Sequence, residues 1–591
     1  MNRNSSPEKP CSSRGKVRWR ALLSALLLFS GFARADFGLS ESADFYTVDT
    51  GAGLVFKVRR TDNGVSTQSA GDIASLVYAG AEYQNQARGS QINSGFDWLY
   101  RDVSAVVVSA EAVGDDRIKI TVEAGDLTHY YMARRGKPHI YMATHFSSEP
   151  NVHGLVRYIM RLSSALLPNG PEPSDLRGTV ATVEARDIFA LPNGETRSKH
   201  YSNHRLKDWS HIGATGSHVG MWIIRDDHEG GSGGPFYRSL LNQTTDTDQE
   251  LTYIVNYGQA QTEAFRPGIL NSYTFVVTGG KEPRRRPNTR WFAGMGLKGY
   301  AGPSERGRVV GLGIGCMNPD HEYTVGFANA TAQYWADVRS LFGRHHGSFG
   351  QRKNAGHHNG KRIPKFAGFY YRKGMRPGTY TMTVYKNELE VDVREVTVAA
   401  GETTVVEPIR VTADPSEEAA IWRIGDWDGT PLELLNGDKL TKMHPSDVRI
   451  ETWDPADYIV GESSAADFPA YMWKDINNDH VVRFKLNSDQ IAAGHTLRIG
   501  ITCAFAGGRP NITVNDWTSA FQWPSTQPRT RSLTTGSYRC NNTIYSFDIP
   551  ASAWKQDPGE WNELTITAIS GSGASGFLSA GYSVDSLDLL E

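Results

Sequence analysis

Short runs in which apolar and polar residues alternate, separated by turn residues, recur along most of the 591-residue chain. Between residues 36 and 287 such runs include Leu54–Val58, Ile118–Val122 and Tyr273–Val277. Alternation with a period of two is typical of half-buried β-strands, and the 3.6-residue period of helices is weak here. The pattern predicts an all-β protein whose first unit is a large antiparallel β domain at 36–287.

Two further β domains are expected after a basic, proline-containing link at Lys281–Pro287. In the second, at 290–412, the turn Pro377-Gly378 leads into an alternating strand, as in small β-sandwiches. The third, at 417–591, combines aromatic residues with Asp-rich turns, which suits a jelly roll that binds carbohydrate. Aromatic residues in such a domain also fill cores, so the sugar-binding role and a purely structural role both stay open.

The N-terminus has the features of a secretory signal peptide in the expected order. A basic region at Arg14–Arg20 precedes the apolar run Ala21–Phe29, and Ala33-Arg34-Ala35 supplies small residues for cleavage. The apolar run is too short to span a bilayer, which takes about 20 residues. We therefore expect residues 1–35 to be removed and the mature protein to be secreted, soluble and without a membrane anchor.

Cysteine usage agrees with export. Cys503 and Cys540 lie 37 positions apart in a β-rich region and are expected to pair in an oxidising compartment, which leaves Cys316 unpaired. No Cys-x-x-Cys or His/Cys spacing predicts a metal site. The formal net charge of −2 also argues against binding to nucleic acid.

A basic segment at 194–211 is the strongest functional signal in the chain. It holds seven Lys, Arg and His residues with little acid: Arg197, Lys199, His200, His204, Arg205, Lys207 and His211. Upstream, Arg157 and Arg161 are four apart in a predicted strand, and downstream the glycine-rich turn Gly230–Pro235 leads to Tyr237. A cationic pocket suits an anionic substrate, and a lysine with a lowered pKa suits removal of a carbon-bound proton. The sequence shows no pair of carboxylates of the kind that glycosidases use, so a glycosidase is disfavoured. The alternative to a cationic substrate pocket is a solvated basic loop without a catalytic role.

A second polar segment, at 343–362, holds four histidines: His345, His346, His357 and His358. A His-rich loop is able to bind metal, but no acid or cysteine lies beside these residues, so an exposed insertion is expected. Asp-rich turns elsewhere leave a structural calcium as a hypothesis.

Collinear motifs along nearly the whole mature chain resemble the rhamnogalacturonan lyases of polysaccharide lyase family 4. They are Phe37–Leu39, Tyr46–Thr50, Pro150–Arg161, Gly194–Tyr201, Gly233–Phe236, Gln261–Glu263, Leu297–Tyr300, Ala332–Trp335, Met443–Asp447 and Phe505–Pro510. The resemblance implies a catalytic β super-sandwich of the galactose-mutarotase-like type, then a fibronectin-III-like β-sandwich and a jelly-roll domain similar to carbohydrate-binding modules. It also implies a secreted carbon–oxygen lyase, a rhamnogalacturonan endolyase. Such an enzyme cleaves the rhamnose-α-1,4-galacturonate bond of rhamnogalacturonan I, a pectin, by β-elimination and leaves a 4,5-unsaturated galacturonate.

Residue by residue, the resemblance assigns the catalytic lysine to Lys199 and two substrate-binding arginines to Arg157 and Arg161. The position of the family's catalytic histidine is occupied by Gln259, which has no transferable proton at ordinary pH. Three tyrosines, Tyr253, Tyr257 and Tyr237, are candidates to donate the missing proton, and Lys199 itself is another if elimination is syn. Arg197 and Tyr237 are further candidates for substrate binding.

The elimination chemistry needs no cofactor, and a monomer acting on rhamnogalacturonan I is expected. Two other classes of function stay open. One is a non-catalytic rhamnogalacturonan-binding protein that has lost the histidine, and the other is an adhesion or sensing protein whose basic cleft holds a different acidic glycan. Detection of an unsaturated uronate separates a lyase from both.

Overall fold

The computed structural model describes residues 36–591 except 66–67, 94, 100–105, 151–154, 203, 209, 257–262, 316, 341–367 and 535–538. The predicted signal peptide, Cys316, the His-rich insertion, Tyr257 and Gln259 lie outside the described residues. Residues Ala35–Glu591 form one compact unit.

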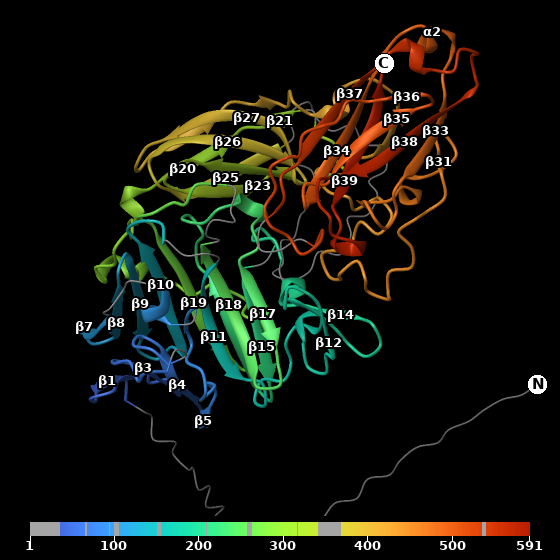
Figure 1. The fold of residues 1–591 in the computed structure, drawn as a ribbon. Coiled ribbons are helices and arrows are strands. Elements are labelled where there is room, and N and C mark those ends of the chain that lie inside the picture. The colour runs from blue at the N-terminus through green and yellow to red at the C-terminus, as the bar shows by residue number, and fades with distance from the viewer. Residues whose placement is uncertain are drawn as a thin grey trace, which may run out of the picture. The chain divides into compact units, whose positions relative to one another are not determined.

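The first part of the chain forms β-sheets, as the alternation predicts (Figure 1). A five-stranded antiparallel sheet contains, in spatial order, β1 (Gly38–Glu41), β2 (Phe45–Asp49), β3 (Leu54–Arg59), β4 (Ile73–Tyr78) and β5 (Ala81–Glu82). A seven-stranded antiparallel sheet has the order β15 (His211–Gly216), β16 (Val219–Arg225), β19 (Leu270–Thr278), β10 (His139–Phe146), β9 (Leu127–Arg134), β8 (Arg117–Ala124) and β7 (Val107–Val113).

Two smaller sheets position the candidate site. A four-stranded sheet has the order β17 (Leu240–Thr244), β18 (Asp248–Asn256), β11 (Val156–Ser163) and β6 (Gln91–Ile92). A three-stranded sheet has the order β12 (Ala181–Glu184), β13 (Ile188–Ala190) and β14 (Thr196–Arg197). Short helices in this part are α1 (Phe96–Leu99) and the 3₁₀ helices η1 (Glu172–Ser174), η2 (Lys199–Ser202), η3 (Gly234–Phe236) and η5 (Arg290–Gly294).

One apolar core joins the five-, seven- and four-stranded sheets. On β8 the buried residues are Ile118, Ile120, Val122 and Ala124, every second position, and on β11 they include Tyr158 and Met160. The outer side of β9 and β10 is covered too, because Phe292, Met295 and Leu297 pack there against Tyr130, Met132, Tyr141 and Ala143. Residues beyond the expected boundary at 287 therefore pack with the first domain.

The described residues of the second domain form three sheets. The strands are β20 (Gly307–Gly311), β21 (Ile314–Gly315), β22 (Tyr323–Ala328), β23 (Gln333–Asp337), β24 (Arg339–Ser340), β25 (Gly368–Met375), β26 (Gly378–Lys386), β27 (Leu389–Val398), β28 (Thr403–Val406) and β29 (Ile409–Arg410). The sheet orders are β24-β25-β20-β28, β21-β29 and β23-β22-β26-β27. The 3₁₀ helix η6 (Pro303–Glu305) precedes these strands and η7 (Pro415–Glu417) follows them.

The third domain has two five-stranded sheets around a core of its own. One contains β30 (Ala420–Gly425), β39 (Gly581–Leu590), β34 (His495–Phe505) and β37 (Thr543–Ile549), with β32 (Tyr471–Trp473) also paired to β39. The other has the order β31 (Tyr458–Ile459), β33 (His480–Lys485), β38 (Trp561–Ile569), β35 (Arg509–Val514) and β36 (Trp517–Thr518). The helices are α2 (Ser488–Ile491), η8 (Ala465–Asp467), η9 (Ala551–Ala553) and η10 (Gly576–Leu578). The all-β prediction is therefore confirmed.

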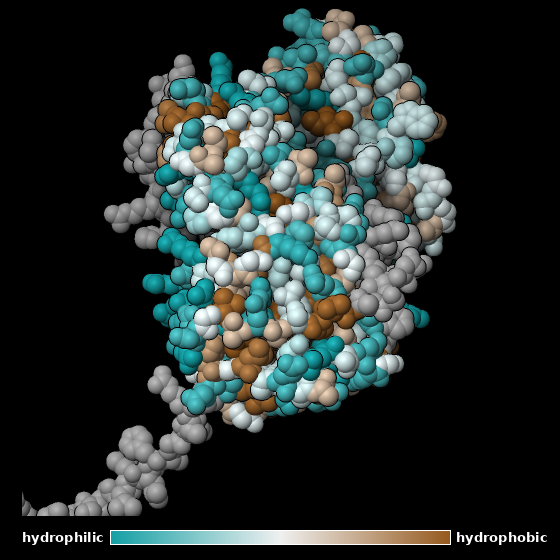
Figure 2. Space-filling model, turned by 90° about the vertical axis from the view of Figure 1, so that its left-hand side faces the viewer, coloured by the Kyte–Doolittle hydropathy of each residue, from teal (hydrophilic) through white to brown (hydrophobic). Residues whose placement is uncertain are grey.

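The surface is mostly polar on the face that Figure 2 shows, with apolar side chains in small separate groups. Among the described residues no helix has both the length and the apolar character needed to cross a bilayer.

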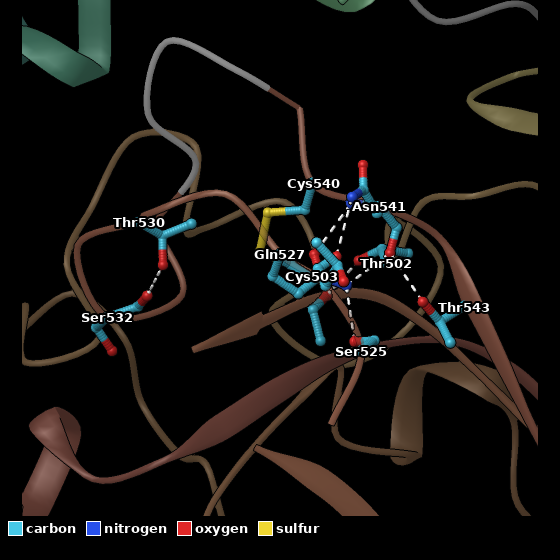
Figure 3. The surroundings of a disulfide bond; sticks show 11 residues. Thr502, Cys503, Ser525, Gln527, Thr530, Ser532, Cys540, Asn541 and Thr543 are labelled. Carbon is cyan, nitrogen blue, oxygen red and sulfur yellow. Dashed lines mark hydrogen bonds between the residues drawn. A yellow bond between two sulfur atoms is a disulfide. The ribbon is translucent and has the colours of Figure 1, made fainter. Parts of the chain in front are cut away.

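The predicted disulfide between Cys503 and Cys540 is present (Figure 3). It joins β34 to the segment before β37 and closes a loop of 37 positions, so reduction frees a long loop in the unfolded chain. Replacing both cysteines with serine is expected to destabilise the third domain by about 2–4 kcal/mol. Calorimetry checks this, with alkylation confirming that neither cysteine is free in the parent protein. An unchanged melting transition in the double variant would contradict the expectation.

Candidate active site

Lys199 is fixed beside an edge strand of the four-stranded sheet. It begins η2, and Ser202 of that helix donates a hydrogen bond through Oγ to the carbonyl oxygen of Lys199 at 2.7 Å. The same Oγ accepts a hydrogen bond from the backbone nitrogen of Asn242, on β17, at 2.8 Å. The Lys199 side chain remains partly exposed, at 21% of its full surface. The base expected from the sequence therefore has a defined place and access to solvent.

Asp187 binds Lys199. It lies in the turn between β12 and β13, and its Oδ1 accepts a hydrogen bond from Lys199 Nζ at 2.8 Å. Its other oxygen, Oδ2, accepts from Nε and Nη2 of Arg531 in the third domain, at 2.9 and 2.7 Å. Burial alone would raise the pKa of Asp187, but the nearby His200, Lys199 and Arg531 lower it well below its ordinary value. One carboxylate thus holds a cation from each of two domains.

The two arginines of β11 share a face but differ in their surroundings. Residues i and i+4 of a strand point the same way, and here that face is opposite to the apolar core that takes Tyr158 and Met160. Arg157 is half-buried, and its guanidinium has no ion-pair or hydrogen-bond partner among the residues that the structure describes. Strands β17 and β11 are two strand spacings apart, on the order of 10 Å. Arg157 therefore lies on the same small sheet as the strand that supports Lys199.

Arg161, in contrast, is 3% exposed and fully engaged. Its Nε donates to Glu250 Oε1 at 3.3 Å, and Nη1 and Nη2 donate to the carbonyl oxygens of Gly89 and Asn93 at 2.8 and 3.2 Å. Burial lowers the pKa of Arg161, and the negative charge of Glu250 opposes that shift. This geometry supports a structural role for Arg161, in place of the substrate contact expected from the sequence.

Arg197 is also tied to carboxylates. It is 7% exposed, and its Nη2 donates to Glu172 at 3.0 Å and to Glu195 at 2.9 Å. Other cations of the 194–211 segment pair with acids far away in the sequence: Arg205 with Glu388 and Lys207 with Glu322. Arg197 and Arg205 therefore add little net positive charge to the cationic pocket that the sequence predicts, because these carboxylates neutralise them.

Tyr253 and Tyr237 meet at a buried histidine. Tyr253 points into the main core, on the side of β18 opposite to the arginine face, and its hydroxyl lies 3.1 Å from Nδ1 of His228. Burial raises the pKa of Tyr253. The ring of Tyr237, 1% exposed, stacks on His228 with centroids 5.1 Å apart. Their burial disfavours proton donation by Tyr253 and sugar contact by Tyr237; Tyr257 and Gln259 lie outside the described residues.

Thr196, three positions before Lys199, is held by the third domain. Asp447 Oδ2 accepts hydrogen bonds from the backbone nitrogen and Oγ1 of Thr196 at 2.6 and 2.8 Å, and from Arg449 Nη2 at 2.8 Å. Burial would raise the pKa of Asp447, but the hydrogen bonds from Arg449 and Thr196 lower it to about 2. The chain immediately before the candidate base Lys199 is thereby attached to the third domain.

A pH effect follows from Asp447. Its folded pKa of about 2 lies below the usual unfolded value of about 3.9, so its contribution to stability is present above pH ~4 and is lost as pH falls through ~2. We expect Asp447→Asn to lower the melting temperature at pH 7 and to flatten its fall between pH 4 and pH 2. Thermal unfolding at several pH values measures this. Asp438→Asn, at a 63% exposed carboxylate, is the matched control and should behave like the parent protein.

Asp187 and Arg531 are residues that sequence reasoning missed. They lie 344 positions apart, and no spacing or motif connects them. Within the described residues no group of three or more His, Cys, Asp or Glu side chains is placed to hold a metal ion.

Comparison with known proteins gives consistent matches along the chain. Residues 37–299 match "Rhamnogalacturonan lyase B, N-terminal", residues 363–406 match "Polysaccharide lyase family 4, domain II" and residues 420–589 match "Polysaccharide lyase family 4, domain III". Rhamnogalacturonate lyase A of Emericella nidulans is 36% identical over 96% of this chain and 99% of its own length. Rhamnogalacturonate lyase A of Aspergillus aculeatus is 34% identical over 97% of this chain and 99% of its own length. With this coverage and the three matched domains in order, the chain belongs to polysaccharide lyase family 4.

Proposed function

We propose that this protein is a rhamnogalacturonan lyase that cleaves the bond between rhamnose and galacturonate in rhamnogalacturonan I by β-elimination. The family and its named relatives support the reaction. The observation that carries the residue assignment is that Arg157, whose guanidinium has no partner among the described residues, lies on the sheet whose edge strand holds Lys199.

In the proposed reaction, Arg157 binds the galacturonate carboxylate and stabilises the negative charge that develops there as the C5 proton is removed. Lys199 Nζ takes that proton, the C4–C5 double bond forms, and the C4–O bond breaks. The departing rhamnose oxygen then gains a proton, which Lys199 is able to return if it lies on the same face of the sugar. For Lys199 to act as base, its amine must be neutral and detached from Asp187.

Ultraviolet absorbance of the unsaturated uronate tests the proposal. Purified protein is mixed with rhamnogalacturonan I and, in parallel, with homogalacturonan; absorbance should rise with the first and not with the second. Binding to rhamnogalacturonan I without any unsaturated product, at any pH, would favour the non-catalytic binding protein.

Gln259 gives a separate prediction about proton delivery. If Lys199 returns the proton, Gln259→His should change turnover less than about threefold, because a second acid is then unnecessary. The pH–rate profile of variant and parent measures this. A large rise in rate with a new limb near pH ~6.5, the ordinary titration range of histidine, would show instead that the parent enzyme lacks its acid.

Further parts of the proposal concern the setting of the protein. We propose that it is exported after cleavage near Ala35, which its signal-like N-terminus supports. We also propose that it acts as a monomer away from membranes. The proposed elimination uses side chains without an organic cofactor, and a structural calcium stays a prediction. N-terminal sequencing and light scattering of the secreted protein check these statements.

A further inference from the structure

A groove runs between the β12–β13 hairpin of the first domain and loops of the third. Its volume is about 380 Å³, within the range of ligand sites. It is lined by Glu184 of the hairpin, by Ala504–Gly507 at the end of β34, and by Ser525 and Gln527–Arg531. The described lining is mainly polar, which suits a hydrated carbohydrate more than an apolar ligand.

The third-domain wall of this groove is held in place before any ligand binds. Cys503, next to Ala504, is linked to Cys540, and Gln527 exchanges two hydrogen bonds with the backbone of Asn541, at 2.7 and 3.0 Å (Figure 3). Fixed walls reduce the ordering cost of binding a flexible chain.

The groove adjoins Lys199 through shared partners. Arg531 lines the groove and binds Asp187, and Asp187 binds Lys199. Lys199 and the groove are therefore joined through one ion pair, that of Asp187 and Arg531. An endolyase holds several sugars around the cleaved bond, so a groove this close in contacts to Lys199 is a candidate to bind the same chain.

Two side chains supply the chemistry to recognise an acidic sugar chain. Arg529 lines the groove, is exposed, and has no ion-pair partner in the described part of the chain, so it is available to a carboxylate. Trp523 is 88% exposed, which is unusual for a large apolar ring. It is two residues from Ser525 of the groove, and both residues are anchored to the Tyr545 hydroxyl: Trp523 through its carbonyl oxygen at 3.2 Å and Ser525 through its nitrogen at 3.1 Å.

We propose that this groove, together with Trp523 next to it in the chain, is a second binding region for the same polysaccharide: Arg529 binds a galacturonate carboxylate in the groove, and Trp523 stacks on a neighbouring sugar. The inference rests on the proposed function, since it assumes that the acidic chain is the ligand. The groove contributes to binding of the polysaccharide, and the bond is cleaved at Lys199.

The test measures the affinity for two sets of rhamnogalacturonan I oligosaccharides. The short set fits within the Lys199 region, and the long set also reaches the groove. Calorimetry is done in a Lys199→Ala background so that the ligand is not consumed. Trp523→Ala and Arg529→Ala should each weaken binding of the long ligands about five- to tenfold and leave the short ones unchanged. Added salt should reduce the loss of affinity caused by Arg529→Ala, which removes a charge, and should leave the loss caused by Trp523→Ala unchanged. Trp561→Ala is the control, because Trp561 is another exposed tryptophan of this domain but packs against Lys485, 4.4 Å from its ring centroid.

The same substitutions in the active protein separate this inference from the proposed function. With the polymer as substrate, KM should rise and kcat should stay within about twofold. If the parent protein cleaves rhamnogalacturonan I but neither variant changes KM or the binding of long ligands, the groove proposal is wrong. If the parent gives no unsaturated product and the length-dependent loss of binding persists, the lyase proposal fails and the groove stands. Equal loss for short and long ligands would also overturn the groove proposal.

Discussion

Lys199→Ala is expected to lower kcat on rhamnogalacturonan I by about 10²-fold or more and to leave the affinity for it nearly unchanged. The proposed role of Lys199 is realised only in the transition state, because it accepts the C5 proton, so its loss should affect rate and not binding. Initial rates from product absorbance and a calorimetric Kd measure the two separately.

Three controls distinguish this chemical effect from a folding defect. In Lys199→Ala, Asp187 still has Arg531 as a partner, so the hairpin should keep its place and the melting temperature should change little. Lys199→Arg retains the positive charge but supplies no base near neutral pH, and should be as inactive as alanine. Lys57→Ala, at an exposed position of β3, should act like the parent. Turnover near the parent value in Lys199→Ala would show that another group is the base.

Arg161→Ala is expected to destabilise the protein by about 3–5 kcal/mol. The substitution leaves the partly buried Glu250 without its buried partner and removes the donors to two carbonyl oxygens, those of Gly89 and Asn93. Arg88, also within 2.9 Å of Glu250, is 38% exposed and compensates only in part. Denaturant unfolding gives the change in free energy.

Arg157→Ala is the matched comparison, on the same strand and the same face. It removes no described ion pair, so its stability should stay within about 0.5 kcal/mol of the parent. Its KM should rise and its kcat fall, because the uronate carboxylate is bound before and during the reaction. A stable Arg161→Ala protein with the same kinetic defect as Arg157→Ala would show that both arginines contact the substrate.

The contrast between these arginines shows where prediction from the sequence ends. Alternation along β11 is enough to put Arg157 and Arg161 on one face. It does not show that Glu250, 89 positions later, pairs with one of them and not the other. Likewise, the strand pattern predicted the all-β fold, because it depends on neighbouring residues. The pairing of Lys199 with Asp187 and Arg531 depends on how distant segments meet.

Proximity in sequence was also a weak guide to proximity in the site. Tyr253 is next to Thr252 and Ile254, yet the alternation of the strand sends its ring into the main core, away from the arginine face. The disulfide was predictable because only its two cysteines and the oxidising compartment had to be considered. The acids that neutralise Arg205 and Lys207 were not predictable in this way, because Glu388 and Glu322 lie in the second domain.

The sharing of Asp187 between Lys199 and Arg531 has a consequence for protein engineering. A lyase shortened to its first two domains would lose Arg531 and Asp447 together, and Asp187 would then keep Lys199 and His200 as its described basic partners. A chimaera that takes its third domain from a relative would face the same problem unless hairpin residues 181–190 came from that relative too. The catalytic module of this enzyme is therefore larger than the domain that contains its proposed base.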